Sequence, residues 1–139
     1  MHVIGVHHIA VQVRDLDRSR SFYVDVLGMT ETRRQPHAVW VEAAAQPGGV
    51  QTGGASSVIV MLEKCDATDG PQPWASARQG LHLLALTIDV ADRDAWKKRL
   101  LAAGAPLEKE SGFTLYTRDP DGTRIGLSHH PTPRDTTAG

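Results

Sequence analysis

The 139-residue sequence predicts an α+β protein made of two similar halves. A stretch that alternates apolar and polar residues opens each half, and a segment with helical spacing follows it. A shift of 75 positions superimposes the halves, so that Ile9 falls on Leu84 and Ala10 on Ala85. Every pair matched in this way has the same chemical character, which favours a duplicated module.

The first half begins with a strand and a helix. Residues Val6–Val13 alternate with the period of a half-buried strand. Asp15 or Asp17 can then cap a helix whose apolar side chains lie within residues 22–27. Gly28 fits the position just past its end, where a left-handed backbone is common.

The rest of the first half is predicted to be strands and loops. Residues 39–44 and 57–63 are typical of strands, and the glycine-rich stretch 46–54 between them is predicted to be a loop. We place module one at about residues 1–65. Residues 66–80, with two prolines and two glycines, are predicted to link it to module two.

Module two, at about residues 81–130, repeats the order. Residues 83–88 predict a strand, Asp92 can cap the following helix, and Gly104 can end it. Residues 113–117 and 124–128 predict two strands joined by a tight turn at Asp119–Gly122. The stretch 131–139 has no apolar pattern and is predicted to be a loose tail, and His129 and His130 are expected to act as tail residues.

Composition restricts the possible partners and location. The formal net charge is −1 and the basic residues are scattered, so no basic stripe for nucleic acid is present. No apolar run approaches the length of about 20 residues needed to span a membrane, and no signal peptide is apparent. Cys65 is the single cysteine, which fits a reducing cytoplasm.

Three segments carry a resemblance to a known family: residues 8–16 with 22–28, residues 83–89, and the turn and strand at 119–125. In this order they resemble the vicinal oxygen chelate superfamily, also known as the glyoxalase, bleomycin resistance and extradiol dioxygenase group. The resemblance implies a glyoxalase-like fold in which two βαβββ modules curve around a cup for a small organic ligand. It also implies a homodimer.

The resemblance implies metal ligands that this sequence lacks in part. Metal-dependent members carry a His on the first strand, a His on the fifth and a Glu on the eighth. His8 stands at the first of these positions, but the 75-residue shift puts Leu83 at the second, and Gly126 stands at the third. A single imidazole holds a divalent cation poorly. We therefore predict no metal and no other cofactor.

An atypical metal site remains an alternative. A shift of 74 positions would match His8 with His82, although it turns the alternating strand to the wrong face. A bulge near Gly80 could turn His82 inward, and Glu63 could supply an acid from the fourth strand. His8, His82 and Glu63 would then serve a metal-dependent lyase or dioxygenase.

The preferred hypothesis is a metal-free cup that binds a bulky apolar or aromatic molecule, as in family members that sequester antibiotics. The residues expected to line it are His8, Ala10, Gln12, Trp40, Met61, Leu83, Ala85, Tyr116 and Gly126. A second hypothesis is a metal-free enzyme, such as a cyclase, isomerase or lyase, in which His8 or Tyr116 moves a proton. The sequence leaves open whether Trp40, Met61 and Tyr116 face the ligand or the core.

Overall fold

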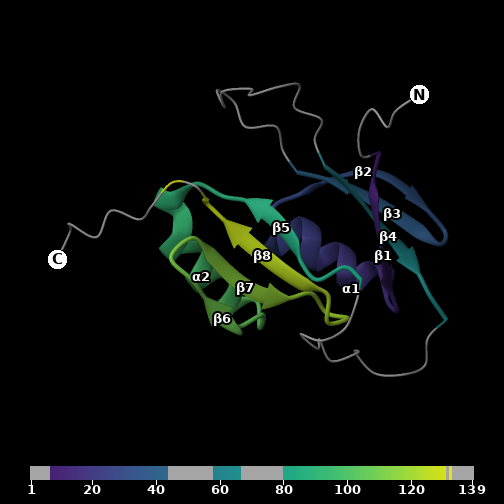
Figure 1. The fold of residues 1–139 in the computed structure, drawn as a ribbon. Coiled ribbons are helices and arrows are strands. Elements are labelled where there is room, and N and C mark those ends of the chain that lie inside the picture. Colours follow the sequence, from purple (N-terminus) through teal and green to yellow (C-terminus); the bar gives the residue numbers. More distant parts are fainter. Residues whose placement is uncertain (1–6, 44–57, 67–79, 131, 133–139) are drawn as a thin grey trace, which may run out of the picture. The chain divides into compact units, whose positions relative to one another are not determined.

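The computed structural model describes residues 7–43, 58–66, 80–130 and 132. The chain divides into two compact units, Met1–Asp69 and Gly70–Gly139, and each is described by itself. Each unit holds a four-stranded sheet with a helix, so the predicted α+β fold of two βαβββ modules is confirmed (Figure 1). The predicted loop at 46–54, most of the predicted linker and nearly all of the predicted tail lie outside the described residues.

The first unit forms a sheet with the strand order β1-β4-β3-β2. The elements are β1 (Ile9–Val13), α1 (Leu16–Ser21), a π-helical turn (Phe22–Val26), β2 (Thr30–Gln35), β3 (Ala38–Glu42) and β4 (Ile59–Lys64). β1 runs parallel to β4, whereas β3 is antiparallel to both β4 and β2. The buried apolar residues of this unit come from β1, β3 and β4 and from the π-helical turn and the residues that follow it.

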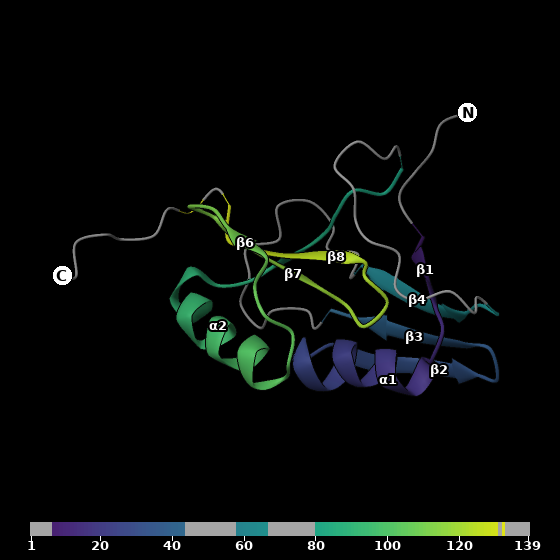
Figure 2. The ribbon, with the colours of Figure 1, turned by 90° about the horizontal axis from the view of Figure 1, so that it is seen from below.

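The helix of the first unit packs on one face of its sheet. α1 contacts β3 and β4 (Figure 2), and the side chains of Val39, Val60 and Leu62 beneath it are fully buried. Asp15 caps the helix, because its Oδ1 accepts a hydrogen bond of 2.9 Å from the backbone N–H of Arg18. A π-helical turn then ends the helix, and Gly28 follows with φ 74°, as the sequence predicted.

The second unit repeats this arrangement with the order β5-β8-β7-β6. Its elements are β5 (Leu84–Thr87), a 3₁₀ turn (Val90–Asp92), α2 (Arg93–Ala102), β6 (Lys109–Glu110), β7 (Thr114–Arg118) and β8 (Arg124–Ser128). β5 is parallel to β8, and β7 is antiparallel to both β8 and β6. α2 runs along one face of this sheet (Figures 1 and 2).

The helix of the second unit begins at the predicted position, but without the predicted capping hydrogen bond. Asp92 precedes α2 but its side chain makes no capping hydrogen bond. Asp89 caps the preceding 3₁₀ turn instead, since its Oδ1 accepts a hydrogen bond of 2.8 Å from the N–H of Ala91. The α-helix itself starts at Arg93, directly after Asp92, and the 3₁₀ turn with its Asp89 cap precedes it. Gly104 follows the helix with φ 71°, in agreement with the prediction.

Two of the four edge strands, β2 and β6, were not predicted from the sequence. Both consist of polar residues, and every residue of β2 except the half-buried Glu31 is exposed. An edge strand pairs on one side only and can carry polar side chains on both faces, so it leaves no apolar alternation to detect. The residue pattern alone therefore located three of the four strands in each module.

His129 is not a tail residue. Its side chain is buried, and its Nε2 lies 2.9 Å from Nη1 of the buried Arg93 at the start of α2. Its Nδ1 lies 2.6 Å from the carbonyl oxygen of Thr132, so that Nδ1–H donates to the carbonyl and Nε2 accepts from the guanidinium. His129 thereby ties the end of β8 to α2, while His130 is exposed.

No helix in the described part of the chain is both long enough and apolar enough to cross a membrane.

Candidate functional site

The sheet face of the first unit that α1 does not cover carries a row of side chains across four strands. The strand register places Ala10, Met61, Trp40 and Arg33 side by side, from β1 to the edge strand β2. Ala10 is exposed, and Met61 and Trp40 are half-buried. The guanidinium carbon of Arg33 lies 4.9 Å from the centre of the Trp40 ring, close enough for a cation–π contact.

Polar groups lie beside this row. Gln12 is paired in register with Glu63, and the side chains of both are exposed. His8 precedes β1 and is also exposed, and its Nδ1 lies 2.8 Å from Nδ1 of His7. One of these two nitrogens must carry the shared hydrogen and the other must accept it. The tautomer of one ring therefore determines the tautomer of the other.

The corresponding face of the second unit has the same plan with different residues. Ala85, Gly126 and Tyr116 are neighbours in register on β5, β8 and β7. The guanidinium carbon of Arg124, which precedes Gly126 by two residues on β8, lies 4.5 Å from the centre of the Tyr116 ring. Alternate residues of a strand point to the same side, so Arg124 and Gly126 share this face.

Leu83 fills the space above Gly126. A Cβ atom placed on Gly126 would lie 3.3 Å from Cδ1 and 3.4 Å from Cδ2 of Leu83, and 3.1 Å from Cγ2 of Thr114. Distances this short show that the Leu83 side chain leans over the glycine on the same face as Ala85. His82, the preceding residue, is exposed, and its Nε2 lies 3.1 Å from Nη1 of Arg124.

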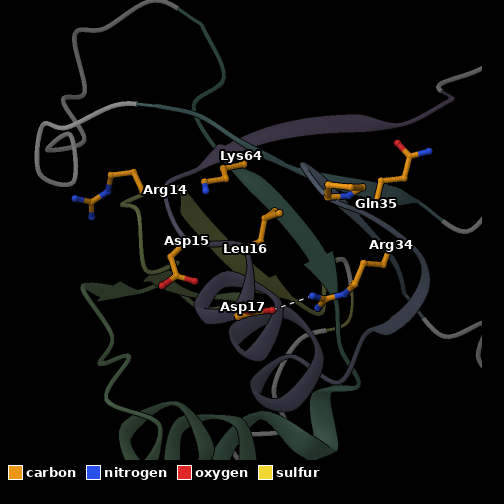
Figure 3. A pocket seen from close by; sticks show the side chains of 8 residues that line it. Arg14, Asp15, Leu16, Asp17, Arg34, Gln35 and Lys64 are labelled. Atoms are coloured by element: carbon orange, nitrogen blue, oxygen red, sulfur yellow. Dashed lines mark hydrogen bonds and ion pairs between the residues drawn. The ribbon is translucent and has the colours of Figure 1, made fainter.

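A surface hollow of the first unit lies on the side that α1 covers. It has a volume of about 680 Å³ and is lined by Arg14, Asp15, Leu16, Asp17, Arg34, Gln35, Pro36 and Lys64 (Figure 3). Asp17 accepts a hydrogen bond of 2.9 Å from Arg34, and Asp15 caps α1. Because these charges serve the helix and its edge strand, we assign the hollow a structural role.

Carboxylates join each helix segment to its edge strand. Glu31 on β2 accepts hydrogen bonds of 2.9 Å from both Arg34 and Arg20, and these contacts lower the pKa of its carboxyl group. Glu110 on β6 pairs with Lys97 and, at 3.3 Å, with Arg93, and the pKa of its carboxyl group is lowered mainly by Lys97. These ion pairs belong to the helix-covered side of each unit.

The family follows from a match over most of the chain. Residues 5–127 match the model of the Glyoxalase/Bleomycin resistance protein/Dioxygenase superfamily. The chain belongs to this superfamily. The resemblance seen in the sequence is thereby confirmed, and the superfamily is known for many reactions on one fold, so membership alone names no activity.

Solved structures share the glyoxalase-superfamily fold of this chain. A glyoxylase/bleomycin resistance protein/dioxygenase domain from Frankia sp. EAN1pec is 25% identical, with a TM-score of 0.64 over 92% of this chain and 98% of that one. The fosfomycin resistance protein FosX from Listeria monocytogenes, solved with Mn(II) and sulfate, is 16% identical, with a TM-score of 0.68 over 92% and 91%. A lactoylglutathione lyase from Agrobacterium tumefaciens is 21% identical, with a TM-score of 0.62 over 92% and 95%. No curated protein sequence matches the chain.

The residues of this chain do not fit the metal site that the superfamily implies. Leu83 and Gly126 offer no donor atom at two of the three ligand positions, and the Leu83 side chain lies where a side chain at 126 would extend. The Nε2 atom of His82 is within hydrogen-bonding distance of a guanidinium group, a cation that would repel a metal ion there. Within the described residues no three His, Cys, Asp or Glu side chains cluster as metal ligands would.

The structure groups the predicted site residues by unit. Ala10, Met61 and Trp40 form one row in the first unit, with Gln12 beside them and His8 preceding the strand. In the second unit the predicted Leu83, Ala85, Tyr116 and Gly126 are neighbours on one face.

Two arginines on these faces, Arg33 and Arg124, were not among the predicted site residues. Arg124 and Gly126 are two residues apart on one strand, so the sequence alone indicates that the Arg124 side chain lies on the same side of the sheet as Gly126. Arg33 lies in the edge strand that the residue pattern did not indicate, so its orientation had no basis in the sequence.

Proposed function

We propose that this chain binds a small organic molecule with a bulky apolar or aromatic body on the sheet faces of its modules that the helices do not cover, without a metal ion. The observation that carries the proposal is Leu83 packed over Gly126. At two of the three positions where metal-dependent members of the superfamily place ligands, this chain has an apolar side chain and a glycine. A surface that could coordinate oxygen atoms is thereby replaced by one suited to apolar contact.

The composition of the two faces supports this ligand class. Trp40 and Tyr116 are half-buried, so each presents part of a flat ring that can stack on a planar ligand. Met61 supplies an adaptable apolar surface beside Trp40, and Ala85 is small and exposed beside Gly126. Gln12 adds an exposed amide for orienting polar groups of the ligand.

The biological role we propose is sequestration of a toxic small molecule, such as an antibiotic. The name of the superfamily includes bleomycin resistance proteins, and one structural neighbour is a fosfomycin resistance protein. We further propose that the chain acts as a homodimer in the cytoplasm, since two-fold dimers are the commonest oligomers and a single cysteine suits a reducing compartment.

A metal-free enzyme is the second candidate, and the contact between His7 and His8 favours it. Because the two Nδ1 atoms share one hydrogen bond, Nε2 of His8 is left to exchange a proton with a ligand. If the chain is an enzyme of this kind, His8→Ala should abolish turnover and leave ligand binding within about twofold. Turnover that survives His8→Ala would exclude His8 as the acid or base.

The binding proposal can be tested with the neutral fluorophore N-phenyl-1-naphthylamine and tag-free protein treated with a chelator. We expect saturable binding, and Gly126→Val should weaken it about tenfold because the added methyl groups need the space that Leu83 and the ligand body occupy.

Gly112→Val is the matched control, because a Cβ atom on Gly112 would meet nothing within 4 Å. It should leave the affinity for the fluorophore unchanged. No saturable binding to the chelator-treated protein, or equal losses in both variants, would contradict the proposal.

A further inference from the structure

The sheet face of the second unit that α2 does not cover carries a charged end as well as an apolar floor. Arg124 and Arg118 are directly paired in register on the antiparallel strands β8 and β7, so two positive charges lie side by side. Like charges in this arrangement are unfavourable unless an anion lies close by. Lys109, on the edge strand, is paired in register with Tyr116 and adds a third positive charge.

Glu108 is shared by both arginines. One of its carboxylate oxygens bonds Nε of Arg118, and the other lies 3.9 Å from Nε of Arg124. The latter distance is too long for a hydrogen bond and leaves an ion pair of modest strength. Asp119, which follows Arg118 directly, accepts hydrogen bonds at its Oδ1 from the N–H groups of Asp121 and Thr123 in the tight turn.

Arg124 is held in a fixed position beside the glycine floor. Its side chain is only 10% exposed, its guanidinium group stacks on the Tyr116 ring at 4.5 Å, and Nη1 lies 3.1 Å from Nε2 of His82. Because Arg124 precedes Gly126 by two residues, the two α-carbons are about 7 Å apart along the strand. A ligand body resting beside Gly126 can therefore reach the guanidinium group with a short substituent.

We infer that the ligand of this face is an organic anion, with an aromatic or apolar body against Leu83, Ala85 and Tyr116 and an anionic group paired with Arg124. This inference rests on the proposed binding function and specifies the charge of its ligand. A planar guanidinium group pairs with a carboxylate or sulfonate through two parallel hydrogen bonds, which adds directional selectivity to the charge attraction. The neighbouring Arg118 and Lys109 strengthen the attraction without being required to touch the ligand.

The test uses two fluorophores that share an anilinonaphthalene body. 8-Anilinonaphthalene-1-sulfonate carries an anionic group, and N-phenyl-1-naphthylamine does not. We expect Arg124→Met, which keeps the length of the side chain, to weaken binding of the sulfonate about tenfold and that of the neutral probe by less than about twofold. Arg124→Lys should give an affinity for the sulfonate between those of the wild type and Arg124→Met, because it keeps the positive charge but loses the paired hydrogen bonds of the guanidinium group.

Arg99→Met is the matched control for these variants. Arg99 also stacks on an aromatic ring of the second unit, at 5.3 Å from the centre of Trp96, but it lies on α2 and not on the sheet face. It should leave the affinities for both probes unchanged. An equal loss of sulfonate binding in Arg99→Met and Arg124→Met would show a diffuse charge effect and would overturn the inference.

Salt dependence decides the matter if Arg124→Met proves unstable. Raising the salt concentration of the wild-type solution from about 50 mM to about 500 mM should weaken binding of the sulfonate and leave the neutral probe unaffected. A sulfonate affinity that depends neither on salt nor on residue 124 overturns this inference while the neutral probe still binds. If neither probe binds the wild-type chain, the proposed binding function itself fails.

Discussion

The sheet faces of the two units that the helices do not cover follow one plan and differ in the middle residue of each row. In the first unit the row is Ala10, Met61 and Trp40, and in the second it is Ala85, Gly126 and Tyr116. Each row begins with alanine and ends with an aromatic ring on which an arginine stacks. The residue in the middle is therefore the main difference between two otherwise equivalent surfaces.

This difference shows how a duplicated module can separate its structural and binding roles. Met61 fills the middle of its own row, whereas Gly126 leaves the middle of its row to the side chain of Leu83, the residue that precedes β5. A surface completed by a neighbouring side chain can be reshaped when that side chain turns. We therefore expect ligand selectivity to depend more on the second unit than on the first.

The largest expected difference between the two faces is in the free energy of unfolding, when an acidic residue replaces the middle residue of each row. Gly126→Glu should lower the free energy of unfolding by about 2 kcal/mol, because its Cβ alone approaches Thr114 and Leu83 to 3.1 and 3.3 Å. Met61→Glu replaces a half-buried side chain of similar length and should cost about 1 kcal/mol. Urea unfolding followed by circular dichroism measures both, and equal costs would contradict the crowding around Gly126.

A smaller effect is expected when the aromatic ring of each row is removed. Tyr116→Ala should weaken binding of N-phenyl-1-naphthylamine about tenfold, and Trp40→Ala about threefold, if the second unit dominates the contact with the ligand. Fluorescence titration of both variants gives the ratio directly. A greater loss in Trp40→Ala would place the main binding surface on the first unit.

The smallest effect concerns acid stability on the opposite, helix-covered sides. The pKa values of Glu31 and Glu110 are both lowered in the folded chain, so each ion pair contributes stability above the unfolded-state pKa of about 4.3. That contribution is lost as the pH falls through the lower folded-state pKa.

The free energy of unfolding should therefore depend less on pH in Glu31→Gln than in Glu110→Gln. The reason is that Glu31 accepts hydrogen bonds of 2.9 Å from two arginines. Thermal unfolding of both variants between about pH 3 and about pH 6 measures the difference. The idea is wrong if both variants lose stability with acid as steeply as the wild-type chain.

The sequence predicted the strands and helices in which the spacing of apolar residues matches the positions that are buried. The strands β1, β3, β4, β5, β7 and β8 and both helices were found in this way, and the duplication predicted that they form two equal modules. The polar edge strands β2 and β6 were not found, because pairing along one edge requires no apolar face. The buried position of His129 was also missed, since it depends on Arg93, which is 36 residues away in the chain.

The sequence indicated the site through strand parity. The 75-residue shift placed Leu83 on the same face as Ala85, and the structure has Leu83 beside Gly126 on that face. Strand parity also indicates the face on which Arg124 lies, but not that Arg33 and Arg124 stack on Trp40 and Tyr116. Their positions result from long side chains that fold back over rings on neighbouring strands, and strand periodicity carries no information about such contacts.

Titration of tag-free protein with Mn(II), followed by calorimetry, tests the claim of metal-free binding most directly. The donor set at positions 8, 83 and 126 predicts no saturable uptake up to about 1 mM Mn(II), and the same affinity for N-phenyl-1-naphthylamine with or without a chelator. One-to-one binding of Mn(II) that disappears in both His8→Ala and His82→Ala would contradict it.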